Sequence, residues 1–280
     1  MASDSRFAVL IDADNVSVKY IKIILDEISK DGIATYKRIY GDWTNPSLVS
    51  WKSALLDNSV TPIQQYSYTT GKNSTDSAMI IDAMDILYSG KVEGFCLVSS
   101  DSDFTRLASR LRESGMTVIG MGESKTPNSF IAACNKFKYL DILAAADEEE
   151  PEEAPKKTPQ KKTPSRKTSS PKKAAKEESK TEKEPKQESK KQEKSIEEPR
   201  TSLRTIRRAL RTIVRENSDE DNWIIIGKVG NILDKRYPDF DVRNFGFSKL
   251  TPFLDSLDMF EIKSERKDNN SSPQMYVRLK

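Results

Sequence analysis

The chain has 280 residues, enough for one large domain or two small ones. Hydrophobic residues make up 36% of the chain and charged residues 32%, a lean composition for a single globule, which predicts that part of the chain does not fold. Histidine is absent, which excludes Ser-His-Asp triads, Cys-His proteases and His-ligated zinc. Any chemistry must therefore use carboxylates, hydroxyls, amines or a metal held by oxygen.

The cysteines and the apolar runs indicate where the protein resides. Cys96 and Cys134 are too few for a disulfide framework and lie in apolar contexts, so we interpret them as packed thiols in a reducing compartment. No apolar run approaches the roughly 20 residues of a transmembrane helix, and the N-terminus shows no signal-peptide pattern. We expect a soluble, cytoplasmic protein.

Charge and proline divide the chain into three segments. Lys and Arg number 46 against 43 acidic residues, for a net charge of +3. Residues 147–200 contain 30 charged residues and seven prolines without one aromatic, so this segment is predicted to be a disordered linker. A solvated spacer is its simplest interpretation, with phosphate contact by the lysines of 156–173 as the alternative. The linker separates residues 1–146 from residues 201–280.

The first segment alternates strand-like and helix-like runs. Strands are expected at residues 7–11, 34–40, 62–65, 95–99 and 117–121, and helices at residues 16–28, 48–56, 75–88, 104–114 and 129–134. This alternation predicts right-handed crossovers and a mostly parallel sheet with helices on both faces. The expected fold is a three-layer, Rossmann-like α/β sandwich.

Acidic residues follow two of the predicted strands. The first strand runs into Asp12-Ala13-Asp14, and the fourth is followed by Asp101-Ser102-Asp103. A strand order of 3-2-1-4-5 would bring Asp12 and Asp101 together at the carboxyl edge, where Asp76, at the start of a helix, would approach them. Converging carboxylates repel one another unless a cation lies between them, and ligands that are all oxygen select Mg²⁺ or Mn²⁺.

Such an ion is suited to phosphodiester hydrolysis, because it activates water and neutralises charge on the phosphate oxygens. Each acid also has a simpler explanation: Asp14 or Asp103 could cap the following helix, and Asp76 could be favoured by the helix dipole. Asp12 precedes its helix by several residues, so capping explains it poorly. Asp82 and Asp85, further along the same predicted helix as Asp76, could be solvated or could line the site.

Three motifs in order, Val9 to Asn15, Thr75 to Met84 and Ser99 to Phe104, resemble the NYN domain, the LabA-like branch of the PIN-like nucleases. The resemblance covers about residues 5–142. It implies a metal-dependent endoribonuclease that hydrolyses RNA with Mg²⁺ or Mn²⁺. The carboxylates that would hold the metal and carry catalysis are Asp12, Asp76, Asp101 and Asp103, and the neighbouring residues expected to support them or to bind substrate are Asn15, Lys72 and Ser100.

A rival from another class of chemistry is a phosphatase of the haloacid-dehalogenase type, in which Asp12 would attack phosphorus and Asp14 would act as acid and base. Those enzymes need a flap between the first strand and its helix. Helix-like residues begin here at Val16, which disfavours the phosphatase.

The last segment predicts a winged helix-turn-helix. Helices are expected at residues 202–217, 229–237 and 248–256, strands at 259–263 and 274–279, and a turn or short strand at 223–227. The first helix places five arginines on one face: Arg204, Arg207, Arg208, Arg211 and Arg215. An arginine stripe without intervening acids favours contact with a nucleic-acid backbone over a merely solvated face.

The segment from Tyr237 to Leu250, with its Gly-Phe-Ser-Lys-Leu core, resembles the OST-HTH or LOTUS domain, and the resemblance covers residues 201–280. Members of that family bind RNA or protein partners, and the pairing with an NYN domain favours RNA. The candidates for contact are Arg243, Asn244 and Lys249. Our main hypothesis is a metal-dependent endoribonuclease with a C-terminal RNA-binding module, and the alternative is a non-catalytic RNA-binding adaptor.

Overall fold

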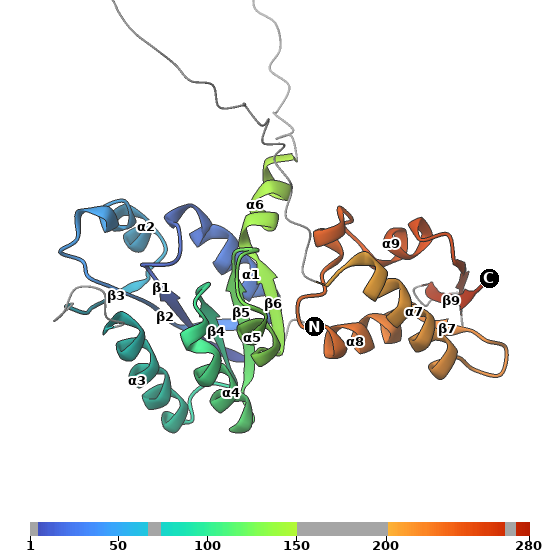
Figure 1. The fold of residues 1–280 in the computed structure, drawn as a ribbon, viewed down its shortest axis with the longest axis horizontal. Coiled ribbons are helices and arrows are strands. Elements are labelled where there is room, and N and C mark those ends of the chain that lie inside the picture. The colour runs from blue at the N-terminus through green and yellow to red at the C-terminus, as the bar shows by residue number, and fades with distance from the viewer. Residues whose placement is uncertain (1–4, 67–73, 150–200, 267–272) are drawn as a thin grey trace, which may run out of the picture. The chain divides into compact units, whose positions relative to one another are not determined.

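A computed structural model of the chain describes residues 5–66, 74–149, 201–266 and 273–280 (Figure 1). The predicted linker, residues 147–200, lies outside this range except for its first three residues, which end a helix. Within the described helices, none combines the length and the apolar character needed to cross a bilayer.

The N-terminal part is built on a parallel sheet of six strands. In chain order these are β1 (Arg6–Asp12), β2 (Ile33–Gly41), β3 (Thr61–Gln64), β4 (Gly94–Val98), β5 (Thr117–Gly122) and β6 (Lys136–Tyr139). Their spatial order is β3-β2-β1-β4-β5-β6, and every neighbouring pair is parallel. The predicted order of the first five strands is therefore confirmed, and β6 extends the sheet by one strand that the sequence pattern did not predict.

Six α-helices belong to the same part of the chain (Figure 1). They are α1 (Ile21–Asp31), α2 (Trp51–Asp57), α3 (Ser74–Ser89), α4 (Thr105–Glu113), α5 (Asn128–Ala133) and α6 (Leu140–Glu149). The predicted first helix begins later than expected, because Val18–Tyr20 forms a 3-10 turn before α1.

Two hydrophobic cores lie on the two faces of the sheet, because successive side chains of a strand point to opposite sides. Leu10 of β1 packs with the apolar stripes of α3, α4 and α5, whereas Val9 and Ile11 pack with those of α1 and α2. Both cysteines are free and buried. The predicted three-layer α/β sandwich is confirmed.

The C-terminal part is a small helical domain with an antiparallel sheet. Its elements are α7 (Leu203–Asn217), β7 (Ile224–Ile225), α8 (Ile226–Arg236), α9 (Leu250–Ser256), β8 (Phe260–Glu265) and β9 (Gln274–Leu279). The strands are ordered β7-β9-β8, so β8 and β9 form the predicted hairpin. Ile206, Leu210 and Ile213 of α7 are fully buried and form one core with Phe253 of α9, which fixes the arginine side of α7 outward.

Candidate active site

Three carboxylates converge at the carboxyl edge of the parallel sheet, where the loop that follows β4 approaches α3. Asp76 lies in the first turn of α3, and Asp101 and Asp103 lie in the loop between β4 and α4. One oxygen from each side chain lies within 4.8 Å of the others. We call Asp76, Asp101 and Asp103 the acidic cluster. Because all of its donors are carboxylate oxygens, the cluster fits a hard divalent cation such as Mg²⁺ or Mn²⁺.

Local hydrogen bonds set the path of the loop that carries two of these acids. The backbone N–H of Asp101 donates to Ser99 Oγ at 3.1 Å, and Asp101 Oδ1 accepts from the Asp103 N–H at 2.9 Å. Asp101 therefore caps the short 3-10 turn Ser102–Phe104, and Phe104, which is fully buried, anchors that turn in the core. The capping role that the sequence suggested for Asp103 belongs to Asp101, and Ser17 rather than Asp14 occupies the N-cap position of the turn that follows β1.

Asp12, at the end of β1, is fully buried beside the acidic cluster. Its carboxylate accepts hydrogen bonds from the Asp14 N–H at 3.0 Å, from Asn15 Nδ2 at 2.7 Å and from Ser99 Oγ at 2.8 Å. Burial nevertheless raises the pKa of Asp12 above its usual value, although these three bonds act to lower it. Asp12 does not belong to the three carboxylates whose oxygens lie within 4.8 Å of one another.

The electrostatics of the site centre on Asp76. Burial, followed by the charges of Asp12, Asp101, Asp103 and Asp14, raises the pKa of Asp76 to about 6. The folded protein therefore disfavours the ionised form of Asp76. A divalent cation bound among these carboxylates would reverse that preference, because it would replace mutual repulsion with attraction.

The other residues expected near the site have various roles in the structure. Asn15 donates to Asp12, and Ser100 Oγ accepts the Glu123 N–H at 3.0 Å, so both support the loops at the sheet edge. Lys72 lies outside the described residues. Asp85 is exposed on α3 and takes no part in the acidic cluster.

Asp82 holds α3 against the sheet. Its carboxylate accepts hydrogen bonds from Arg38 and from the hydroxyl of Tyr40, both on β2, and Tyr40 is fully buried. Asp82 thus belongs to a partly buried polar network six residues after Asp76 and is not a member of the acidic cluster.

Two supporting residues were not identified from the sequence. Ser99 bridges the ends of β1 and β4 through its bonds to Asp12 and Asp101. Gly122 ends β5 so close to this loop that an added Cβ would lie 2.7 Å from the Ser99 carbonyl oxygen and 2.7 Å from Thr126 Oγ1. A serine or glycine that follows a strand is too common a pattern to single either residue out.

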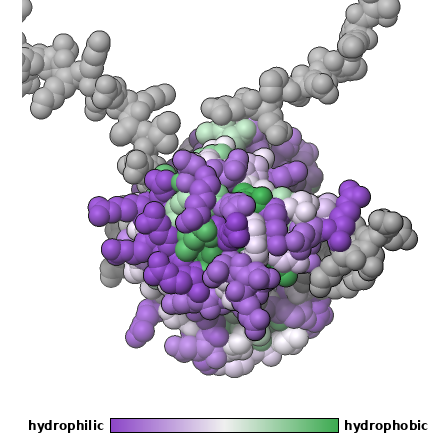
Figure 2. All heavy atoms as spheres, turned by 90° about the vertical axis from the view of Figure 1, so that its right-hand side faces the viewer, coloured by the Kyte–Doolittle hydropathy of each residue, from purple (hydrophilic) through white to green (hydrophobic). Residues whose placement is uncertain are grey.

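The C-terminal domain exposes its arginine stripe. Arg204, Arg207, Arg208, Arg211 and Arg215 are all exposed on α7. Arg207 also donates to the Leu257 carbonyl oxygen at 2.8 Å. On the face turned to the viewer in Figure 2, hydrophilic residues predominate and hydrophobic residues show only in small patches. The stripe has the charge and the exposure that contact with a phosphate backbone requires.

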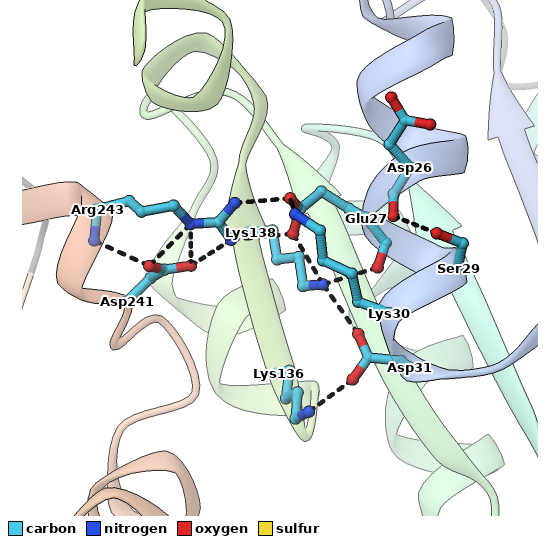
Figure 3. A network of polar contacts seen from close by, with 9 residues as sticks. All are labelled: Asp26, Glu27, Ser29, Lys30, Asp31, Lys136, Lys138, Asp241 and Arg243. Carbon is cyan, nitrogen blue, oxygen red and sulfur yellow. Dashed lines mark hydrogen bonds and ion pairs between the residues drawn. The ribbon is translucent and has the colours of Figure 1, made fainter. Parts of the chain in front are cut away.

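Two of the other expected contact residues, Arg243 and Asn244, bind protein groups, and Figure 3 shows the contacts of Arg243. The Arg243 guanidinium donates to Glu27 at 2.6 and 2.9 Å and to Asp241 at 2.6 Å. Burial acts to raise the pKa of Glu27, but hydrogen bonds from Arg243 and Lys30 hold it well below its usual value.

Asn244 Nδ2 donates to the Asp239 carbonyl oxygen at 2.9 Å, whereas Lys249 is exposed just before α9.

Comparison with known proteins assigns both parts of the chain. The family model of the NYN domain matches residues 6–141, and that of the OST-HTH/LOTUS domain matches residues 200–272. The crystal structure of a protein of unknown function from Vibrio parahaemolyticus is similar at 19% identity and a TM-score of 0.42, covering 50% of this chain and 97% of that chain. No curated protein matches the sequence. The chain thus contains an NYN domain, of the PIN-like nuclease superfamily, followed by an OST-HTH/LOTUS domain.

Proposed function

We propose that this chain is a divalent-metal-dependent endoribonuclease whose C-terminal domain binds the RNA. The observation that carries the proposal is the acidic cluster, in which three carboxylates share one edge of the sheet beside buried Asp12 and the pKa of Asp76 is raised to about 6. Asp76 and Asp101 are partly buried and Asp103 is exposed. Holding mutually repelling carboxylates so close together is costly, and a site built this way is typical of function.

Each side chain has a role in this proposal. Asp76, Asp101 and Asp103 would hold Mg²⁺ or Mn²⁺, which when bound lowers the pKa of water and stabilises charge on the phosphate. Asp12 orients the loop that carries Asp101, because both residues bond to Ser99 Oγ, and its own charge adds to the field at the cluster. Attack of water on the phosphodiester is expected to leave a 5′-phosphate and a 3′-hydroxyl.

The arginine stripe of α7 supplies RNA affinity in this proposal. Its five exposed arginines would contact phosphates without reading the base sequence, so they would concentrate RNA for the nuclease domain.

The structure also disfavours the phosphatase. Only residues 13–17 lie between β1 and the following 3-10 turn, and such a short segment has no room for a flap.

A titration of Mn²⁺ with end-labelled single-stranded RNA tests the proposal. We expect metal-dependent cleavage that EDTA abolishes and that Asp76→Asn or Asp101→Asn lowers by on the order of 100-fold or more. Asp85→Asn is the matched control, because it removes an exposed acid from the same helix as Asp76 but outside the acidic cluster. Cleavage that survives Asp101→Asn would contradict the assignment.

A non-catalytic RNA-binding adaptor is the second candidate. It is favoured by the three hydrogen bonds that Asp12 already accepts from the protein. Intact RNA bound equally well by the parent chain and by Asp101→Asn, over the whole Mn²⁺ range, would establish the adaptor.

A further inference from the structure

A groove of about 430 Å³ lies between the loop of residues 13–18 that follows β1 and the segment 45–51 that leads into α2. Asp14 connects this groove to the acidic cluster. Its side chain lines the groove, its N–H donates to Asp12 Oδ1, and its charge contributes to the raised pKa of Asp76. Through this bond to Asp12, the groove adjoins the edge of the sheet that carries the acidic cluster.

The lining of the groove suits an uncharged ligand group. Leu48 and Trp51 are 7% and 2% exposed, so they offer a ligand little apolar surface, whereas the exposed polar residues of the groove are neutral: Ser17, Asn45, Ser47 and Ser50. Among the described lining residues there is no lysine or arginine, and the single charged group is Asp14. A phosphate would be repelled there by Asp14, whereas a base and its ribose offer neutral hydrogen-bonding edges that match the neutral polar lining.

The segment that carries Asn45 and Ser47 is held in place by its own backbone. Asn45 Oδ1 accepts the Ser47 N–H at 3.0 Å, and the Asn45 N–H donates to the Asp42 carbonyl oxygen at 2.9 Å. In the part of the chain that the structure describes, Asn45 Nδ2 and the hydroxyls of Ser17 and Ser47 have no protein partner. The bond from Ser47 therefore orients the Asn45 amide, and all three groups are free to bond a ligand.

We propose that this groove is the subsite for the nucleoside next to the scissile phosphate of single-stranded RNA. The proposal rests on the nuclease function and specifies where the substrate lies: the phosphate at the acidic cluster, and the adjoining base and ribose in the groove, with Asn45 and Ser47 at their hydrogen-bonding edges. It predicts that the enzyme reads the base at one position beside the cut and leaves more distant positions unread.

Photo-crosslinking with 4-thiouridine-substituted RNA tests the subsite independently of cleavage. The full chain is irradiated with Ca²⁺ in place of Mn²⁺, digested with trypsin and analysed by mass spectrometry. Crosslinks are expected in the tryptic peptide of residues 39–52, which spans the groove segment. In parallel, kcat and KM are measured with Mn²⁺ on oligoribonucleotides that differ at single positions.

The variants separate ligand contact from folding. Ser47→Ala removes a hydroxyl without a protein partner, and Asn45→Asp keeps the oxygen that accepts from Ser47 while it replaces the amide donor with a negative charge. We expect crosslinking to fall and KM to rise by about 2- to 10-fold for Ser47→Ala and by more for Asn45→Asp, with the Mn²⁺ activation constant unchanged. Ser53→Ala, on the exposed side of α2 and outside the groove, is the control and should change neither.

Each pattern of results decides one of the two proposals. Crosslinks at 39–52 in a chain that cleaves no RNA would refute the nuclease, and with it a subsite beside a scissile phosphate, and would leave the groove as an RNA-binding site. Cleavage with unchanged KM and unchanged base preference in Ser47→Ala and Asn45→Asp, or crosslinks confined to other peptides, would refute the subsite and leave the nuclease standing.

Discussion

Replacing Asp76 by Asn should stabilise the metal-free protein at pH 8, which is unusual for a change at a partly buried polar residue. The pKa of Asp76 is raised from 3.8 to about 6 by burial and by four neighbouring carboxylates. A difference of one pKa unit corresponds to about 1.4 kcal/mol, so the whole rise in the pKa of Asp76 corresponds to about 3 kcal/mol of lost stability. Because Asp76 is only partly buried, solvent screens these charges. We therefore expect Asp76→Asn to raise the free energy of unfolding by about 1–2 kcal/mol.

Proton linkage determines the sign of this stability change and the pH range over which it appears. Because the folded protein holds this proton more tightly than the unfolded chain, stability falls as pH rises from about 4 through about 6 and is lowest above that range. Asn cannot ionise, so the advantage of Asp76→Asn should be full at pH 8 and should vanish at pH 4. Saturating Mn²⁺ should reverse the order at pH 8 by stabilising the parent chain more than the variant.

The assay is urea and thermal unfolding in EDTA, followed by tryptophan fluorescence in a Trp223→Phe background. The remaining tryptophans, Trp43 and Trp51, both belong to the NYN domain, so the signal reports on that domain alone. A gain of about 3–6 °C in Tm at pH 8 is expected. Asp85→Asn is the control and should show no such pH dependence. If Asp76→Asn instead lowers the Tm at pH 8 in EDTA, the inferred repulsion among the carboxylates is absent and the reasoning fails.

Three further predictions concern the supports of the site and the arginine stripe. Gly122→Ala should lower the free energy of unfolding by about 1–3 kcal/mol and weaken Mn²⁺ binding in a thermal-shift titration, because the new Cβ would press on the Ser99 carbonyl. Tyr40→Phe should cost about 1–2 kcal/mol in urea unfolding, since it removes a buried hydrogen bond to Asp82. Joint replacement of Arg208 and Arg211 by Ala should weaken RNA binding and reduce the slope of log affinity against log salt by about 1.4, measured by fluorescence anisotropy.

Each of these predictions has a control. Gly227→Ala adds a methyl group in open space on α8, so it should not destabilise the protein as Gly122→Ala does. Tyr36→Phe removes a hydroxyl from the same strand without touching Asp82, and its stability should stay near that of the parent. Lys228→Ala removes an exposed cation outside the stripe, and an equal loss of salt dependence there would show that the stripe has no special role.

The sheet and the acidic cluster were largely predictable, because both depend on local patterns. Continuous apolar runs marked β1 and β4, and the acids that follow β4 meet Asp76 in the acidic cluster, whereas Asp12, which ends β1, lies beside the cluster and outside it. The edge strand β6 was not predicted. Lysines and aromatic residues alternate in it, but over only four residues, Lys136 to Tyr139, which is too short a pattern to indicate a strand.

Side-chain contacts between segments that are far apart in the sequence could not be predicted from local sequence patterns. The pairing of Asp82 with Tyr40 depends on how α3 lies across β2, and the bond from Ser99 to Asp12 depends on the register of β1 against β4. Arg243 was expected to contact RNA by resemblance, yet it bonds to Glu27, which lies 216 positions away in the chain. Nothing in a single sequence marks such partners.

The bond between Ser99 and Asp12 spans 87 positions and depends on a parallel pairing that only a long crossover can produce. Such high contact order makes this edge of the sheet slow to assemble during folding. A nascent chain that has emerged only as far as α3 already carries Asp12 and Asp76 but lacks the loop with Asp101 and Asp103. The complete set of acids can thus meet only late in synthesis, after β4 has inserted beside β1.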